Sequence, residues 1–154
     1  MDDFTLARIL HIVAIVPWIG GVAFVTTVLM PAIRRHHPPS ERLAAFHGFE
    51  AGFAWQARLW VGLAGASGFW MIHRADLWSR FSDSRFWWMY AMVAVWAVFA
   101  AMLYVAEPLF LHKRMANSRM PERDFARMEL LHRILLSASL IAVVAAMAGA
   151  HGLI

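Results

Sequence analysis

Histidines are the residues of this sequence with the most chemistry to offer. The chain holds 8 histidines and no cysteine, which excludes disulfides and thiolate metal sites. Imidazole nitrogens ligate haem iron and transition metals. Along the apolar runs of the chain the histidines fall into two layers. One layer holds His11, His73 and His151, and the other holds His47, His112 and His132, with His36 and His37 in the adjoining loop.

Two layers of histidine in a helical bundle are what a transmembrane dihaem cytochrome b requires, since each iron takes two axial imidazoles from facing helices. The candidate pairs are His11 with His151 or His73, and His47 with His132. A second interpretation stays open, because a histidine at a membrane edge often only occupies the headgroup region. His36, His37 and His112 fit that interpretation best, because each lies close to Arg or Lys in a loop.

Long apolar helices must position these side chains. The chain is 61% hydrophobic and 16% charged over 154 residues, which is more apolar surface than a soluble domain of this size can bury. The uncharged run from Ile12 to Ile33 is long enough to span a bilayer core, and no small-residue cleavage site of a signal peptide follows it. We expect one domain over 1–154, an all-α integral membrane four-helix bundle. Its helices should cover about 5–33, 44–72, 86–110 and 125–150.

The Arg and Lys residues predict how the helices are oriented. The loops at 34–46 and 112–127 carry most of them, whereas the opposite face has fewer and dilutes them with aspartates. Cytoplasmic loops are enriched in Arg and Lys. We therefore expect both of these loops in the cytoplasm and both termini on the outer, periplasmic side of a bacterial inner membrane. The same reasoning assigns the basic residues to topology, so we expect no nucleic acid partner.

Arg58 and Trp18 are the other candidate cofactor-binding residues. Arg58 lies inside the apolar run of the second helix, where an unpaired Arg costs about 2.5 kcal/mol or more. Glu50, Glu107 or a haem propionate could pair with it. Trp18 lies within about 20° of His11 on the first helix, so we expect it to pack on the outer macrocycle.

Small residues mark one face of the second helix. His47, Ala54, Arg58 and Gly65 lie on one stripe at 100° per residue, with Ala51, Gly62 and Gly68 beside it. A flat macrocycle needs such room. Close helix packing explains the same glycines, because small residues are its usual device in membranes.

Methionines offer a different chemistry. The chain has 10 Met residues, and thioethers suit Cu(I). Met71, Met89 and Met92 would lie near the outer surface, close to His11, His73 and His151. Methionine is also common filler in apolar helices, so copper is the alternative to haem as the bound cofactor.

Motifs along most of the chain resemble the small membrane proteins of the copper resistance protein D (CopD) family. The matching residues are Leu10-His11, Pro17-Trp18-Ile19-Gly20-Gly21, Pro31, Arg42-Leu43, Ser67-Gly68, Trp88-Met89 and Arg133-Ile134. This resemblance implies a four-helix membrane domain linked to copper passage or haem. The first helix also resembles the oxygen-independent protoporphyrinogen oxidases, but it departs from them after Gly21. The architecture is similar to that of dihaem cytochromes b such as superoxide oxidase.

These observations lead to three hypotheses of function. The first is a CopD-like inner-membrane protein that binds one or two haem b groups and transfers electrons, as a cytochrome b-type oxidoreductase component with a redox partner. The second is a copper-handling membrane protein that uses the outer histidines and methionines. The third is a non-catalytic subunit that packs against a larger membrane complex or against a second copy of itself.

Overall fold

The computed structural model describes residues 2–111 and 118–153, and every element within them is helical. The long elements are α1 (Asp3–Phe24), α3 (Arg42–Arg74), α4 (Trp87–Ala101) and α6 (Pro121–Ala150). The π-helical segment η1 (Val25–Leu29) joins α1 to α2 (Met30–His36), and the π-helical segment η5 (Met102–Leu111) continues α4. Three short 3-10 turns make the connections: η2 (Pro39–Glu41), η3 (Leu77–Ser82) and η4 (Ser84–Phe86).

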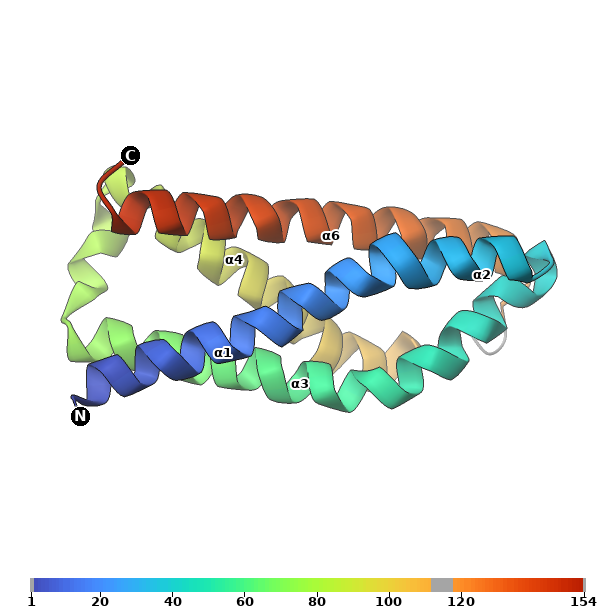
Figure 1. The fold of residues 1–154 in the computed structure, drawn as a ribbon, viewed down its shortest axis with the longest axis horizontal. Helices are drawn as coiled ribbons and strands as arrows, with labels where there is room; N and C mark the ends of the chain where they lie inside the picture. The colour runs from blue at the N-terminus through green and yellow to red at the C-terminus, as the bar shows by residue number, and fades with distance from the viewer. Residues whose placement is uncertain (1, 112–117, 154) are drawn as a thin grey trace.

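The long helical segments lie lengthwise beside one another (Figure 1). α1 packs against α3, and α4 packs against α6. Both chain termini lie at one end of the molecule, which we call the termini end. The turn from α2 to α3 lies at the opposite end, the α2–α3 end. α1 and α3 are in contact toward the termini end, and the helical segments then diverge before they meet again at the α2–α3 turn.

The helices extend slightly beyond the ranges expected from the sequence. The first helical segment runs on to His36 instead of residue 33, and α6 begins at Pro121 instead of residue 125. Pro17 does not interrupt α1, which continues through it to Phe24, and membrane helices tolerate an internal proline. The basic loop expected over 112–127 is described only from Ser118, so His112, Lys113 and Arg114 lie outside the described residues.

Three of the described helical segments are long and apolar enough to cross a membrane: Asp3–His36, Ser84–Glu107 and Pro121–Ala150. α3 is not among these three, since Gln56 and Arg58 interrupt its apolar stretch. Large apolar side chains cover the outside of the segments, such as Val16 at 66% exposure and Val144 at 67%. A soluble protein seldom exposes so much contiguous apolar surface, and these faces indicate a lipid bilayer environment.

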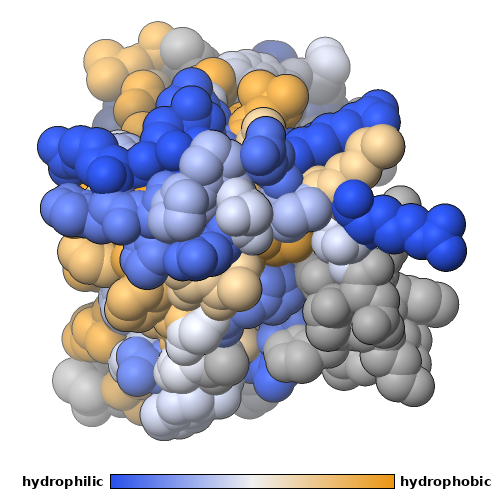
Figure 2. All heavy atoms as spheres, turned by 90° about the vertical axis from the view of Figure 1, so that its right-hand side faces the viewer, coloured by the Kyte–Doolittle hydropathy of each residue, from blue (hydrophilic) through white to orange (hydrophobic). Residues whose placement is uncertain are grey.

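Hydrophilic side chains gather on the α2–α3 end, which Figure 2 views directly. Arg34, Arg35 and Arg42 are at or near this end, with Arg119, Arg123 and Arg127 close to the start of α6. Polar groups at the end of apolar helices match the change from hydrocarbon to headgroups at a membrane surface.

Each π-helical segment is associated with a proline. Pro31 lies two residues after the end of η1 and Pro108 lies within η5. A proline has no N–H to donate to the carbonyl four residues earlier, and its ring crowds that carbonyl. Thr26 and Thr27 donate their hydroxyl hydrogens to the carbonyl oxygens of Val22 and Ala23 at 2.7 Å. These bonds give the two carbonyl oxygens a hydrogen-bond donor where the helix widens into η1. Widened turns of this kind are frequent at functional sites.

Glycines on α3 receive side chains from the neighbouring helices. A Cβ added to Gly65 would lie 2.5 Å from Nε1 of Trp96, and one added to Gly62 would lie 2.7 Å from the Tyr104 hydroxyl. Trp96 donates its indole hydrogen to the Val61 carbonyl at 2.9 Å. The room that the small residues leave is therefore filled by side chains of the protein itself, as close helix packing requires.

Candidate functional site

A cavity of about 460 Å³ lies between the long helical segments, toward the α2–α3 end. Its wall is mostly apolar, and a few polar side chains interrupt it. The aromatic residues in the wall are Trp18, Phe24, Phe46, Phe49, Phe53 and Phe99, and the ionisable ones are Glu50, Glu107 and His132. Both π-helical segments contribute to it, η1 through Val25 and Leu29 and η5 through Met102 and Leu103. Cavities of about 300–1,000 Å³ with this composition are typical of small-molecule and cofactor sites.

His132 is the one histidine among the described wall residues. It lies one turn beyond Met128 on α6, and its Nδ1 is 2.9 Å from the Met128 carbonyl oxygen. A carbonyl only accepts hydrogen bonds, so Nδ1 carries the proton and the lone pair is on Nε2. Histidines that ligate metals are commonly held in this way.

His47, the expected partner of His132, is not part of the cavity wall. Both imidazoles pack edge-on against Phe46, whose ring centroid is 6.4 Å from that of His47 and 5.6 Å from that of His132. The structure thus brings the predicted inner pair to the same phenylalanine. Joint ligation by the two histidines stays a prediction.

Trp18 lines the same cavity as His132, although we expected it beside the outer His11. Its ring meets Phe99 edge-on at 5.2 Å between centroids, and the residue is only 6% exposed. Its indole Nε1 is buried without an acceptor among the described residues. Leaving a buried donor unpaired costs about 1–3 kcal/mol, so this N–H is suited to meet an acceptor on a bound molecule.

Arg58 is paired at the rim of this region. Its Nη2 donates to Oε1 of Glu107 at 2.9 Å, and its Nε donates to the Leu103 carbonyl at 3.0 Å. The sequence suggested three partners for Arg58, and Glu107 is the one that the structure shows. The pair links α3 to η5 and satisfies a charge that would otherwise be costly within an apolar helix.

Within the described part of the chain, no hydrogen bond or ring contact joins the histidines of the other layer. His11 is directed at α3, where its Nδ1 lies 2.8 Å from the Ala64 carbonyl oxygen and 3.2 Å from the Ser67 hydroxyl. His73 and His151 are exposed at the ends of α3 and α6, and His151 bonds to the Met147 carbonyl of its own helix. Axial ligation by His11, His73 and His151 stays a prediction.

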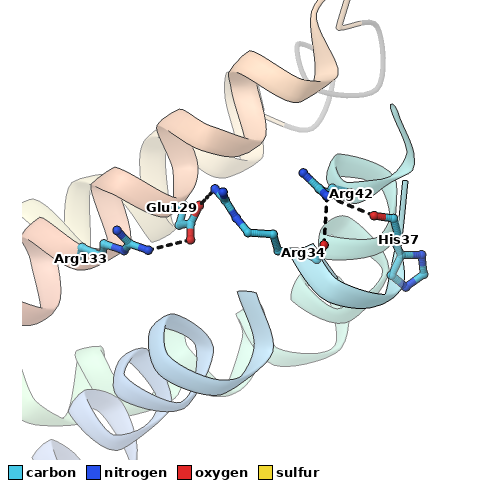
Figure 3. A network of polar contacts seen from close by, with 5 residues as sticks. All are labelled: Arg34, His37, Arg42, Glu129 and Arg133. Carbon is cyan, nitrogen blue, oxygen red and sulfur yellow. Dashed lines mark hydrogen bonds and ion pairs between the residues drawn. The ribbon is translucent and has the colours of Figure 1, made fainter. Parts of the chain in front are cut away.

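Sequence reasoning missed one buried carboxylate, that of Glu129. It is 4% exposed and is bound by Arg34 of α2 and by Arg133 of its own helix, the latter at 2.9 Å (Figure 3). Arg42 lies nearby and donates to the carbonyl oxygens of His37 and Arg34. The i,i+4 spacing of Glu129 and Arg133 is a signal for one of these ion pairs. The sequence has no local signal for the pair with Arg34, which is 95 residues away.

Among residues 2–111 and 118–153, no group of three or more His, Asp or Glu is placed to hold a metal ion. Comparisons with known proteins add no assignment, since no family model, curated protein or solved structure matches this chain.

Proposed function

We propose that this protein is a CopD-like cytochrome of the bacterial inner membrane that binds haem b in the cavity beside His132 and transfers electrons. In this proposal α1–η1–α2, α3, α4–η5 and α6 form a four-helix bundle in the membrane. The α2–α3 end faces the cytoplasm, and both termini lie on the outer side.

The observation that supports the cofactor is the position of His132. Its Nε2 carries the lone pair, and the residue is part of the wall of an apolar cavity of about 460 Å³. Haem is a large, flat and mostly apolar ligand, and bundle cores are where such ligands are held. The aromatic wall is suited to a macrocycle, and the Trp18 N–H, which has no acceptor among the described residues, is suited to its peripheral acceptors.

The residues would have separate roles toward the haem. His132 would be an axial ligand, and His47 is the second ligand that the sequence suggests. The Met128 carbonyl would hold the His132 ring in position and raise its basicity. Arg58 already has a carboxylate partner in Glu107, so we assign it to the structure of the cavity rim instead of to a propionate. When bound, the haem would supply a one-electron couple, and the protein would set its potential through ligation and burial.

The orientation rests on charge. Residues 34–42 and 119–133 lie at the α2–α3 end and carry seven arginines against four carboxylates among the described residues. Excess Arg on one side of apolar helices is the signal of the cytoplasmic face. Both termini are at the other end (Figure 1), which this proposal assigns to the periplasm.

A reduced-minus-oxidised visible spectrum of the purified protein, with haem quantified by the pyridine assay, tests the proposal. We expect the bands of a low-spin b haem. The haem content of the His132→Ala variant should be lower than that of the wild-type protein by a factor of about ten or more. His36→Ala is the matched control, because His36 makes the same bond to the carbonyl four residues earlier but is exposed. A wild-type protein without haem bands would reject the proposal.

A further inference from the structure

The ion pairs around Glu129 leave one positive charge in excess. One carboxylate is shared by two guanidinium groups, with Arg34 on one oxygen and Arg133 on the other (Figure 3). Each of the two arginines uses a single Nη of its side chain for this carboxylate. The remaining N–H groups have no partner among the described residues, and the side chains are 52% and 63% exposed. Glu129 thus holds two exposed arginines in fixed positions.

Both arginines lie where the apolar helices end. Arg34 directly follows the uncharged run that ends at Ile33, and Arg133 directly precedes the apolar run that begins at Ile134. They belong to different helices, and their shared partner places them at the same level. In a bilayer, this boundary is where the phosphate groups of phospholipids lie.

An exposed apolar stripe on α6 leads away from Arg133. Leu140, Val144 and Met147 are 50%, 67% and 59% exposed. At 100° per residue these three positions lie within about 40° of the direction of Arg133, so they share its helix face. This stripe is suited to an acyl chain, and the two guanidinium groups at its end are suited to a phosphate, which they bind through charge-assisted hydrogen bonds.

We propose that Arg34 and Arg133, oriented by Glu129, form a binding site for the headgroup phosphate of an anionic phospholipid in the adjoining leaflet. The excess positive charge favours an anionic lipid over a zwitterionic one. The apolar stripe favours a lipid over free phosphate. Basic sites at the cytoplasmic ends of membrane helices recognise anionic headgroups by this chemistry. The site is separate from the cavity, and it does not depend on haem binding.

The test measures lipid-dependent thermal stability of the full chain in a mild non-ionic detergent, followed by the fluorescence of its 8 tryptophans. The added probes are phosphatidylglycerol, phosphatidylcholine and inorganic phosphate. We expect phosphatidylglycerol to raise the melting temperature with saturation, since a ligand of the folded state stabilises it. Phosphatidylcholine and inorganic phosphate should produce less effect at equal concentration. An equal effect of inorganic phosphate would overturn the assignment to a lipid.

Variants decide whether the site is specific. Arg34→Gln and Arg133→Gln each leave one arginine on Glu129, and each should weaken phosphatidylglycerol binding about fivefold. Arg133→Lys keeps the charge and should retain most of the binding. Arg127→Gln is the matched control, because Arg127 is 58% exposed near the same end but is paired with the half-buried Asp124. Equal losses in Arg127→Gln and Arg133→Gln would show a general charge effect and overturn the proposed site, as would no loss in either Arg34→Gln or Arg133→Gln.

Discussion

Toward the termini end, aromatic side chains fill notches left by glycines of α3, whereas toward the α2–α3 end aromatic rings surround a cavity. α3 takes part in both arrangements. It presents Phe46, Phe49 and Phe53 to the cavity, and Gly62 and Gly65 to side chains of the helical segment that follows it. The same helix is thus bulky where the neighbouring helices diverge and small where they approach (Figure 1).

This difference determines where a ligand can bind. No space for a ligand remains beside Gly62 and Gly65, because the hydroxyl of Tyr104 and the indole of Trp96 occupy it. Phenylalanine side chains on diverging helices cannot close the gap between them, and a void remains in the middle. Polar groups at this end then have two tasks, to line the void and to tie the separated helices together. Glu107 with Arg58 and Glu129 with Arg34 make such ties between helical segments.

The largest expected effect tests the tie at the α2–α3 end. The double variant Arg34→Gln/Arg133→Gln leaves the Glu129 carboxylate buried without a cation, and we expect a loss of about 3 kcal/mol in the free energy of unfolding. Unfolding by SDS titration in mixed micelles measures it. Adding Glu129→Gln should recover most of the loss, because the uncompensated charge is then removed. If the triple variant is no more stable than the double variant, the loss does not come from the buried carboxylate.

A smaller effect is expected at the glycine notches. Gly65→Val places its side chain against the Trp96 indole, which is held by its bond to the Val61 carbonyl. We expect a loss of about 2 kcal/mol from overpacking, measured by the same titration. Gly20→Val is the control, since a Cβ at Gly20 meets no atom within 4 Å. Similar losses at both positions would show that the notch is not closely packed.

The smallest expected effect concerns a polar turn at the termini end. Asp83 accepts hydrogen bonds from the backbone and side chain of Arg85, and these bonds hold the pKa of its carboxyl below the ordinary value of 3.8. A carboxyl with a lowered pKa stabilises the folded state above its ordinary pKa, and this contribution is lost as the pH falls through the lowered value. Asp83→Asn should remove a small part of the acid dependence of the melting temperature below about pH 4. An unchanged profile would show that the exposed pair contributes nothing.

The all-helical fold was predicted from the sequence, because most of the chain consists of long apolar runs with few charges. The sequence also identified Arg58 as a residue that needs a partner, since an arginine inside such a run is costly when unpaired. The sequence left two explanations of the α3 glycines open, room for a macrocycle and close helix packing. In the structure, the side chains of Trp96 and Tyr104 occupy the space beside Gly65 and Gly62. The neighbours of Trp18 and Glu129 were not predicted, because they come from helices far away in the sequence.

Hydropathy and residue spacing determine which stretches are helical, which face of each helix is small or bulky, and which end of the protein is basic. These properties are local, so the amino-acid sequence alone contains them. Trp18 and His132 line the same cavity, and Arg34 and Arg133 bind the same carboxylate. Both arrangements depend on how the helices pair and where they diverge. That pairing follows from the fit of side-chain volumes across several helices at once, and only the tertiary structure decides it.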